Sequence, residues 1–416
     1  MDNAIRDFIK NNKPSNIWEF FANKPTKNVR KLKVLILNAP CMGFGDIVFA
    51  MKFATLLREW YNCEVMIATP QKKGFVSLGE KPSNIYDLNG KNKSDQCRRL
   101  SRLTINKDGK EIPLPKADLL FVAPLQADFD PKISDVQKLL PYANKFNTFY
   151  LSEYNDVLTK KIDFNTGIGG KRLGLLFTDM PPGPKPQQLK HPYCVVYVAN
   201  VLPRMKSCVY NFLTMVTKKY KNQDFEIVIP SWIDDEEFNM KKDISKILQK
   251  YFRHVVFVKK DKTTTVEGKG DHTIYIRMDI LPLSNKLMVD LMTHSVKDIL
   301  LTGDQSITDA LSCCVDKNIF YQIAPWKENF AKNLVKEMPN KWLQRKSESC
   351  GTLKAIHYKS DYVKFKKQWD FRKLAKPKMD GIFNFTAEKI YGPNAQFLQH
   401  FQELALKSNK KGLKNL

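Results

Sequence analysis

The chain has 416 residues, of which 43% are hydrophobic, and it carries a formal net charge of +25 at pH 7. That length and apolar content suit two packed cores and exclude a disordered chain. No segment reaches the roughly 20 apolar residues of a membrane helix, and the N-terminus lacks the apolar stretch of a secretory signal. We therefore expect a cytoplasmic protein without a transmembrane segment. The charge predicts an anionic partner: nucleic acid, an anionic membrane surface or a phosphorylated ligand.

The 8 cysteines form no CxxC pair, and no histidine lies at metal-ligand spacing from them. This distribution favours reduced, mostly buried thiols and predicts that the chain has no metal site. The 6 histidines are scattered, which favours structural roles for them.

The first half of the chain begins with a strand–turn–helix–strand pattern. An apolar run at 33–39 is followed by a glycine-bearing turn at 40–46 and then by apolar residues at helical spacing. A second apolar run at 64–70 completes a βαβ unit, which requires a parallel sheet. Further strands are expected at 117–124, 147–153 and 172–179.

The second half repeats this alternation after a proline-rich linker at 180–192. Its apolar runs, separated by helical patterns, predict strands at 193–200, 225–231, 254–258, 298–303 and 318–324.

Two such blocks predict an α/β fold with two Rossmann-like parallel-sheet domains facing a cleft. We expect an N-terminal Rossmann-like acceptor domain at 1–182 and a C-terminal Rossmann-like nucleotide-sugar domain at 193–326. The remaining residues, 327–416, are basic and predict a mostly helical extension that packs back on the body.

The first candidate motif is the turn that contains Gly43, Gly45 and Asp46. Open α/β sheets bind ligands where strands end and helices begin, and glycines let the backbone approach a ligand closely. Asp46 is then a candidate catalytic base that takes a proton from an acceptor hydroxyl. The alternative is that Asp46 is an ordinary helix N-cap.

The second candidate motif is the segment Gly303, Asp304, Gln305 and Ser306, which directly follows an apolar strand and opens a helix. Small residues, a hydroxyl and free helix N–H groups suit a diphosphate, so these residues are candidates for donor binding. The alternative is a capping box in which Ser306 pairs with Asp309.

The third candidate motif follows the first strand of the second block and contains Arg204 and Lys206. Cations at the carboxyl edge of that sheet could neutralise a leaving diphosphate. The alternative is that they are two more surface cations in a very basic chain.

In this order the motifs resemble GT-B glycosyltransferases, most closely the ADP-heptose:lipopolysaccharide heptosyltransferase type. The resemblance covers 33–70 and 193–326 and is carried by LNAPCMGFGDIVFAMKFATLL, YVANVLPRMKSCVYNFLTMVTKKY and LSNKLMVDLMTHSVKDILLTGDQSITDALSCC. It implies an inverting, metal-independent transfer with Asp46 as base, Arg204 and Lys206 at the diphosphate, and 303–306 holding the donor. The family's usual Asp-Ser-Gly turn is absent, which leaves the nucleotide and the sugar open.

We therefore expect a glycosyltransferase that moves a sugar from a nucleotide sugar, used as a co-substrate without any other cofactor, to an anionic acceptor. That acceptor could be a glycan, a lipid-linked molecule or a nucleic acid. One alternative is a non-enzymatic nucleic-acid or polyanion-binding protein on the same fold, which explains the charge directly. Another is an enzyme of the nucleotide-sugar epimerase type.

Overall fold

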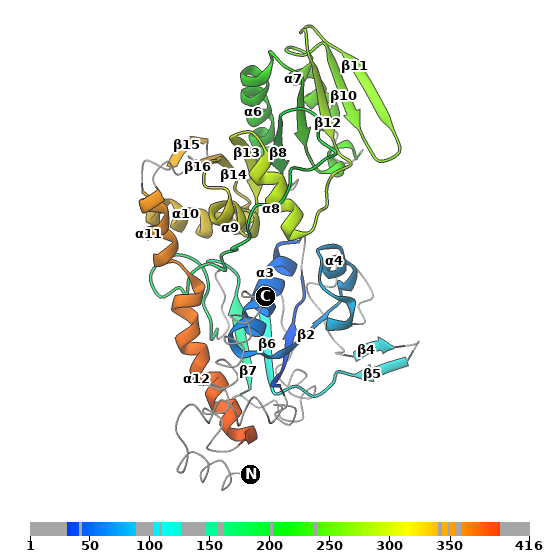
Figure 1. The fold of residues 1–416 in the computed structure, drawn as a ribbon. Coiled ribbons are helices and arrows are strands. Elements are labelled where there is room, and N and C mark those ends of the chain that lie inside the picture. The colour runs from blue at the N-terminus through cyan, green and yellow to red at the C-terminus, as the bar shows by residue number, and fades with distance from the viewer. Residues whose placement is uncertain are drawn as a thin grey trace, which may run out of the picture.

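The computed structural model describes residues 31–40, 44–88, 104–107, 110–125, 147–156, 162–199, 203–235, 240–339, 343–347, 350–353 and 359–391. It shows an α/β protein with two large sheets (Figure 1). Within the described residues, no helix has both the length and the apolar character needed to cross a membrane.

The first sheet is entirely parallel and has five strands in the order β3-β2-β1-β6-β7. These strands are β1 (Lys33–Leu37), β2 (Glu64–Thr69), β3 (Ile85–Asp87), β6 (Leu119–Leu125) and β7 (Thr148–Ser152). The small hairpin of β4 (Thr104–Lys107) and β5 (Lys110–Pro113) forms a separate two-stranded sheet. Helices α3 (Gly45–Tyr61) and α4 (Lys72–Ser77) connect the first three strands.

The second sheet has nine strands in the order β11-β10-β12-β9-β8-β13-β14-β16-β15. Its parallel strands are β8 (Tyr193–Tyr197), β9 (Phe225–Val228), β10 (His254–Val258), β12 (Thr273–Arg277), β13 (Asp298–Thr302) and β14 (Asn318–Gln322). Antiparallel strands follow at its two edges: β11 (Thr263–Glu267), β16 (Cys350–Leu353) and β15 (Leu343–Ser347). The sheet is therefore mixed, which corrects the expectation of two purely parallel sheets.

Helices connect and cover these strands. The connecting helices of the second block are α6 (Pro203–Tyr220), α7 (Met240–Leu248), α8 (Asn285–His294), α9 (Asp304–Cys313) and α10 (Glu328–Glu337). Short 3-10 turns lie at η2 (Pro82–Asn84), η3 (Ser231–Asp234) and η4 (Pro325–Lys327). The chain ends its described part with α11 (Lys359–Gln368) and α12 (Phe371–Tyr391).

In each sheet, the first strand of the block is flanked by strands that lead away from it in opposite directions. In the first sheet this change of direction lies between β1 and β6, and in the second it lies between β8 and β13. Such switch points leave a crevice at the carboxyl ends of the strands, because the following helices cross to opposite faces.

The largest hydrophobic core is continuous between the two sheets. It includes apolar residues of α3 and β6 from the first block together with residues of α8, α9 and β13 from the second. Helices α3 and α9 pack directly against each other and so join the two blocks. Smaller clusters fill the outer faces of the two sheets.

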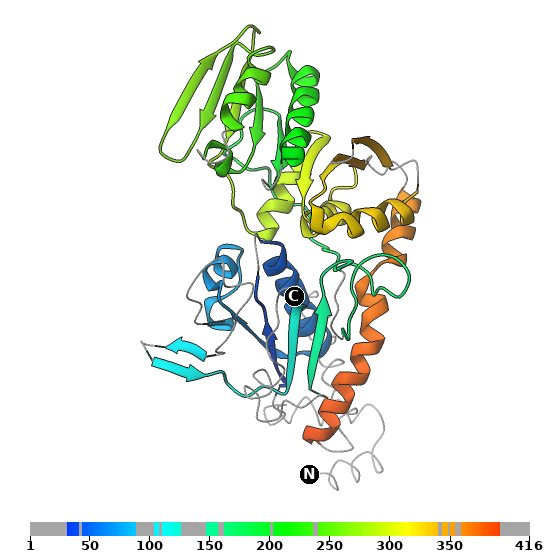
Figure 2. The ribbon, with the colours of Figure 1, turned by 180° about the vertical axis from the view of Figure 1, so that it is seen from behind.

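The C-terminal helices pack along the side of the molecule (Figure 2). The ring of Phe383 on α12 stacks on Tyr61 of α3 with centroids 3.8 Å apart, and Phe371 contacts Phe53 and Trp60. Strands β15 and β16 extend the second sheet beyond residue 326, so this part is less helical than the sequence predicts.

The segment at 172–179, expected to be a strand, is irregular. It makes only isolated bridges, from Gly174 to Gly167 and from Leu175 to Asp370. The segment is rich in apolar residues because it contributes to the shared core, where Leu175 is 0% exposed. Apolar character alone did not distinguish this buried connection from a strand.

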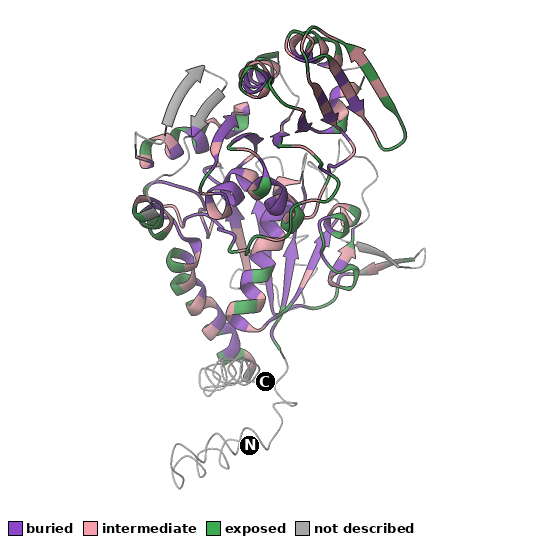
Figure 3. Ribbon diagram, turned by 45° about the horizontal axis from the view of Figure 1, so that its top comes forward, coloured by how far each residue is buried: buried purple, intermediate pink, exposed green. Residues whose placement is uncertain are grey.

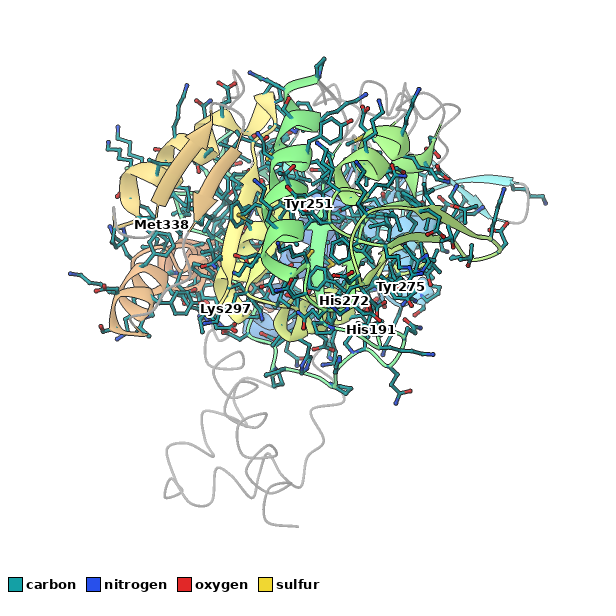
Figure 4. The ribbon with its side chains drawn as sticks, turned by 90° about the horizontal axis from the view of Figure 1, so that it is seen from above. His191, Tyr251, His272, Tyr275, Lys297 and Met338 are labelled. Carbon is teal, nitrogen blue, oxygen red and sulfur yellow. The ribbon has the colours of Figure 1, made fainter. Side chains whose placement is uncertain are left out.

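The proline-rich linker packs on the second sheet. The ring of His191 stacks on Tyr275 of β12, with centroids 5.3 Å apart and an angle of 3° between the planes (Figure 4). The backbone N–H groups of Lys190 and His191 donate to the buried carboxylate of Glu226. His191 therefore has a structural role, as expected from the sequence.

Four cysteines in the described part of the chain are free thiols, as the sequence predicts. Cys63, Cys194 and Cys314 are buried thiols and Cys313 is a half-buried one. Cys208 is disulfide-bonded, which corrects the expectation for that residue.

Candidate active site

The carboxyl ends of the two sheets meet between them. All strands of a parallel set end at one edge, so the segments that follow them collect there. Asp46 follows β1 and Glu153 follows β7 in the first sheet, while Asp304 follows β13 and Lys327 follows β14 in the second. These four side chains are almost completely buried, with 1% to 7% exposure.

A buried side-chain amide forms hydrogen bonds across the switch point of the first sheet. The side-chain nitrogen of Asn38, just after β1, donates to the carbonyl of Asp46 at 3.1 Å and to that of Ala123 in β6 at 2.9 Å. It thereby fixes the start of α3 over the gap between β1 and β6.

A second buried amide has the same role in the second sheet. The side-chain oxygen of Gln322, at the end of β14, accepts from the backbone N–H of Ala199 at 2.9 Å. Its nitrogen donates to the carbonyl of Met205 at 2.9 Å. Both ends of the connection between β8 and α6 are therefore tied to β14.

Lys327 lies where the carboxyl ends of the two sheets meet, a region that we call the junction. Its ammonium nitrogen donates to Glu153 and lies 3.0 Å from Oδ2 of Asp304 and 4.0 Å from Oδ1 of Asp156. We call Asp46, Glu153, Asp156, Asp304 and Lys327 the carboxylate–lysine cluster. It draws on both sheets, so it exists only when the two blocks are packed together.

The cluster shifts the pKa values of its members. Burial alone would lower the pKa of Lys327, but the negative charges of Asp304, Glu153 and Asp156 raise it well above its ordinary value. Lys327 is therefore charged at neutral pH.

An ion pair ordinarily lowers the pKa of its carboxyl group, but the pKa values of two carboxyl groups in the cluster are raised. Burial, followed by the charge of Asp304, raises the pKa of Glu153 well above its ordinary value, although Lys327 opposes the shift. Burial likewise raises the pKa of Asp156 to about 6. The charge of Asp46 adds to both shifts. The junction thus contains carboxyl groups that can carry or accept a proton near neutral pH.

The two predicted glycine–aspartate turns lie beside each other. A Cβ atom placed on Gly45 would be 3.8 Å from Oε1 of Glu153 and 3.9 Å from Oδ1 of Asp304. The turns at 44–46 and 303–306 therefore converge between the sheets, as the sequence argument requires. Gly43 lies outside the described residues.

Neither capping alternative is correct. The N-cap of α3 is Phe44, so Asp46 lies inside the first turn. The N-cap of α9 is Gly303, so Ser306 also lies inside its helix and no capping box with Asp309 forms. Asp309 is instead buried and binds other parts of the molecule.

Asp309 joins the two blocks. Its carboxylate forms an ion pair with Lys52 of α3 at 2.5 Å and accepts from Thr178 at 2.6 Å and from Asn285 at 2.7 Å. These contacts fix α9 against α3 and place the start of α9 at the carboxylate–lysine cluster.

The remaining residues of the second motif have different environments. Gly303 has φ = 75° and ψ = 151°, a conformation that other residues essentially never adopt. Gln305 is 3% exposed, and its side chain interacts with the buried hydroxyl of Tyr154. Ser306 is half-buried.

The predicted cations are more exposed to solvent than the carboxylate–lysine cluster. Arg204 is 48% exposed and forms an ion pair with Glu328 at 3.4 Å, directly after Lys327 in the chain. Lys206 lies half-buried in the same first turn of α6. The structure thus places Arg204 beside the start of α10, rather than against residues 303–306.

Sequence reasoning missed Lys327, Glu153 and Asp156. The signal available was position, because each follows an apolar strand within a few residues. In a chain with 68 basic and 43 acidic residues, that signal does not separate a buried charge from a surface one.

A surface hollow of about 510 Å³ lies elsewhere, beside η3 and α7. It is lined by Ile233, Asp234, Asp235, Lys241, Lys242, Ser245, Lys246 and Gln249. None of the predicted site residues lines this hollow. The side chains of Asp46, Glu153, Asp304 and Lys327 in the carboxylate–lysine cluster are themselves buried.

The carboxylates of the cluster surround an ammonium group. Among the described residues, no group of three or more His, Cys, Asp or Glu side chains is arranged to hold a metal ion. Carboxylates of this kind can accept a proton or hydrogen-bond the hydroxyls of a ligand.

The chain matches no protein-family model, and no curated protein is significantly similar to it.

Proposed function

We propose that the protein is a nucleotide-sugar-dependent glycosyltransferase of the GT-B type. One observation carries the proposal: the carboxyl-edge switch points of two Rossmann-like sheets converge on one cluster that contains Asp46 and Asp304. A transferase needs this arrangement, because donor and acceptor must be held by different parts of the protein and brought together at one point.

In this proposal the donor binds at the switch point between β8 and β13. Gly303, at the start of α9, has no side chain to block the approach of a ligand. The amide of Gln305, in the first turn of α9, can donate and accept hydrogen bonds with a ligand. The first turn of α6, with Arg204 and Lys206, presents cations and free N–H groups.

The charges of the cluster and of Arg204 indicate where the diphosphate of the donor would bind. Three carboxyl groups lie within 4.0 Å of the Lys327 ammonium, so a diphosphate placed directly against Asp304 would meet like charge. The exposed guanidinium of Arg204 offers a more favourable partner at the rim. The sugar, which is uncharged and rich in hydroxyls, then faces the carboxylates.

Asp46 serves as the base for transfer. The acceptor oxygen attacks the anomeric carbon while its proton passes to Asp46. The bond from the anomeric carbon to the diphosphate oxygen breaks, and its electron pair leaves with the nucleoside diphosphate. Direct displacement of this kind inverts the anomeric centre.

Isothermal titration of the full chain with UDP, GDP, ADP and dTDP tests the donor site. We expect one of them to bind, and Arg204→Ala to weaken that binding. Lys332→Ala is the matched control, since Lys332 also pairs with Glu328, at 3.9 Å, but lies on α10. No heat of binding from any nucleotide, in a sample shown to be folded, would refute the proposal.

Two further outcomes would replace it by the alternatives. Turnover of a nucleotide sugar without an added acceptor indicates an epimerase-type enzyme. Salt-sensitive binding of nucleic acid without nucleotide binding indicates a polyanion-binding protein.

A further inference from the structure

The outer face of the C-terminal helices is both apolar and basic. Six large hydrophobic side chains are exposed in the described part of the chain, and three of them lie on α11 and α12: Val363, Leu374 and Phe385. They are 44%, 38% and 45% exposed. Figure 3 shows exposed residues along the outer side of these helices.

The orientation of α12 is fixed by its inner face. Phe371, Ala375, Met379, Phe383 and Ala387 are at most 2% exposed and recur every four residues toward the core. The stacked pair of Phe383 and Tyr61 anchors this face. The outward position of Leu374 and Phe385 is therefore a consequence of packing, and the chain cannot hide them by rotating the helix.

Three exposed residues of α12 share one stripe. Leu374, Gly381 and Phe385 are separated by seven and four positions, which places them on the same side of a helix. Pro377 is exposed beside them. Leu374 and Phe385 lie about 16 Å apart along the axis, at 1.5 Å per residue.

Exposed lysines lie on the same two helices. Lys364 and Lys367 on α11 and Lys373 on α12 are exposed, and among the described residues no carboxylate lies within ion-pair distance of them. Lys389 is exposed beside Phe385, with its ammonium 4.5 Å from the ring centre. Over 359–391 the chain has 9 basic and 4 acidic residues, an excess of +5.

We propose that this outer face of α11 and α12 docks the protein on an anionic lipid bilayer. Exposed Phe and Leu side chains enter the boundary between headgroups and acyl chains, while the lysines bind the anionic headgroups. A nucleic acid would use the lysines but gain little from the aliphatic Leu374 and Val363. The combination therefore favours a membrane surface.

Co-sedimentation of the full chain with vesicles tests the proposal. We expect binding to vesicles of phosphatidylcholine with phosphatidylserine, weak binding to phosphatidylcholine alone, and weaker binding at higher salt. The double variant Leu374→Ser/Phe385→Ser should lose affinity by roughly tenfold or more, because two side chains no longer enter the bilayer. The matched control is Val76→Ser/Leu287→Ser, at exposed apolar residues on other surfaces.

A second pair of variants separates this face from the overall charge. Lys364→Gln/Lys367→Gln/Lys373→Gln should lose on the order of fivefold per lysine. Lys218→Gln/Lys221→Gln/Lys250→Gln, at exposed lysines of the second block, should lose much less.

Three results would overturn the proposal. These are equal binding to neutral and anionic vesicles, equal losses in the face and control variants, and binding to RNA or DNA without binding to vesicles. All substituted side chains are exposed, and circular dichroism verifies that the variants are folded. The outcome is independent of nucleotide binding, so it stands or falls separately from the proposed transfer reaction.

Discussion

The ammonium nitrogen of Lys327 lies 3.0 Å from Oδ2 of Asp304, and the two side chains are only 7% and 1% exposed. Asp304 begins the helix after β13, and Lys327 ends the 3-10 turn after the neighbouring strand β14. The pair also reaches the first sheet, because Lys327 donates to Glu153. A single buried cation thus compensates carboxyl groups from both blocks.

Replacing Lys327 by methionine should strongly destabilise the protein. The substitution keeps the volume of the side chain but leaves buried carboxylates without a counter-charge. Breaking a buried pair in this way costs about 3 to 5 kcal/mol of unfolding free energy. Urea denaturation followed by circular dichroism measures the change.

Two variants test the cause of that loss. Lys332→Met, at a lysine whose side chain is 67% exposed, should change the unfolding free energy by less than about 0.5 kcal/mol. Adding Asp304→Asn to Lys327→Met should recover part of the stability, because Asp304 lies 3.0 Å from the Lys327 ammonium and loses its buried counter-charge in Lys327→Met. If Lys327→Met is as stable as the unmodified protein, the cluster has no electrostatic role.

Asp156 should make the stability depend on pH. Burial raises its pKa from 3.8 to about 6 in the folded protein, so the folded state binds this proton more tightly than the unfolded state. Stability contributed by that proton is therefore full below about pH 4, declines as the pH rises to 6, and is lost above it. With about 1.4 kcal/mol per pKa unit, the decline amounts to about 1 to 3 kcal/mol.

The variant Asp156→Asn removes this proton-binding group. The free energy of unfolding of the variant, minus that of the unmodified protein, should rise between about pH 4 and 6 and stay constant above pH 6. Urea denaturation at a series of pH values measures that difference. Asp261→Asn, at an exposed carboxylate, is the control. An Asp156→Asn difference that is the same at all pH values would contradict the assignment.

Two glycine substitutions separate backbone strain from loss of space. A Cβ atom would meet nothing within 4 Å at either Gly303 or Gly381. Gly303 has φ = 75° and ψ = 151°, whereas Gly381 lies inside α12. Gly303→Ala should therefore cost about 1 to 3 kcal/mol in strain, while Gly381→Ala should stabilise by about 0.5 to 1 kcal/mol. Thermal unfolding measures both changes in stability, and equal changes would contradict this explanation.

Much of the fold could be predicted because apolar runs and glycine turns are local signals. The runs at 33–39, 64–70, 193–200, 298–303 and 318–324 all contain strands in the structure. Strand β11 could not be found in this way. Its sequence, Thr263–Glu267, contains three threonines and is half-buried to exposed, so it has no apolar run.

The candidate site could be predicted only in part. The turns with Asp46 and Asp304 follow apolar strands, and parallel topology brings such turns to one edge. The cation between them could not be predicted, because Lys327 becomes distinct from other lysines only through its burial. That burial depends on contacts with residues 23 and 174 positions away in the chain.

Asp46 and Arg204 should affect different steps of the proposed reaction. Asp46→Asn removes the base, so kcat should fall by about 10² to 10⁴ while donor affinity changes little. Arg204→Ala removes a charged partner of the diphosphate, so donor binding should weaken by about 10-fold to 100-fold. Titration calorimetry measures the affinity, and steady-state assays with the donor that binds measure kcat.

The fold of the Asp46→Asn variant should be intact, which makes the kinetic result interpretable. The charge of Asp46 raises the pKa values of Glu153 and Asp156, so it repels them when all three are ionised. Neutralising Asp46 relieves that repulsion and Asn keeps the size of the side chain, so we expect the variant to fold, which circular dichroism verifies. Full turnover in a stable Asp46→Asn protein would assign the base to another carboxyl group of the cluster, for which Glu153 and Asp156 are the candidates because both can hold a proton near neutral pH.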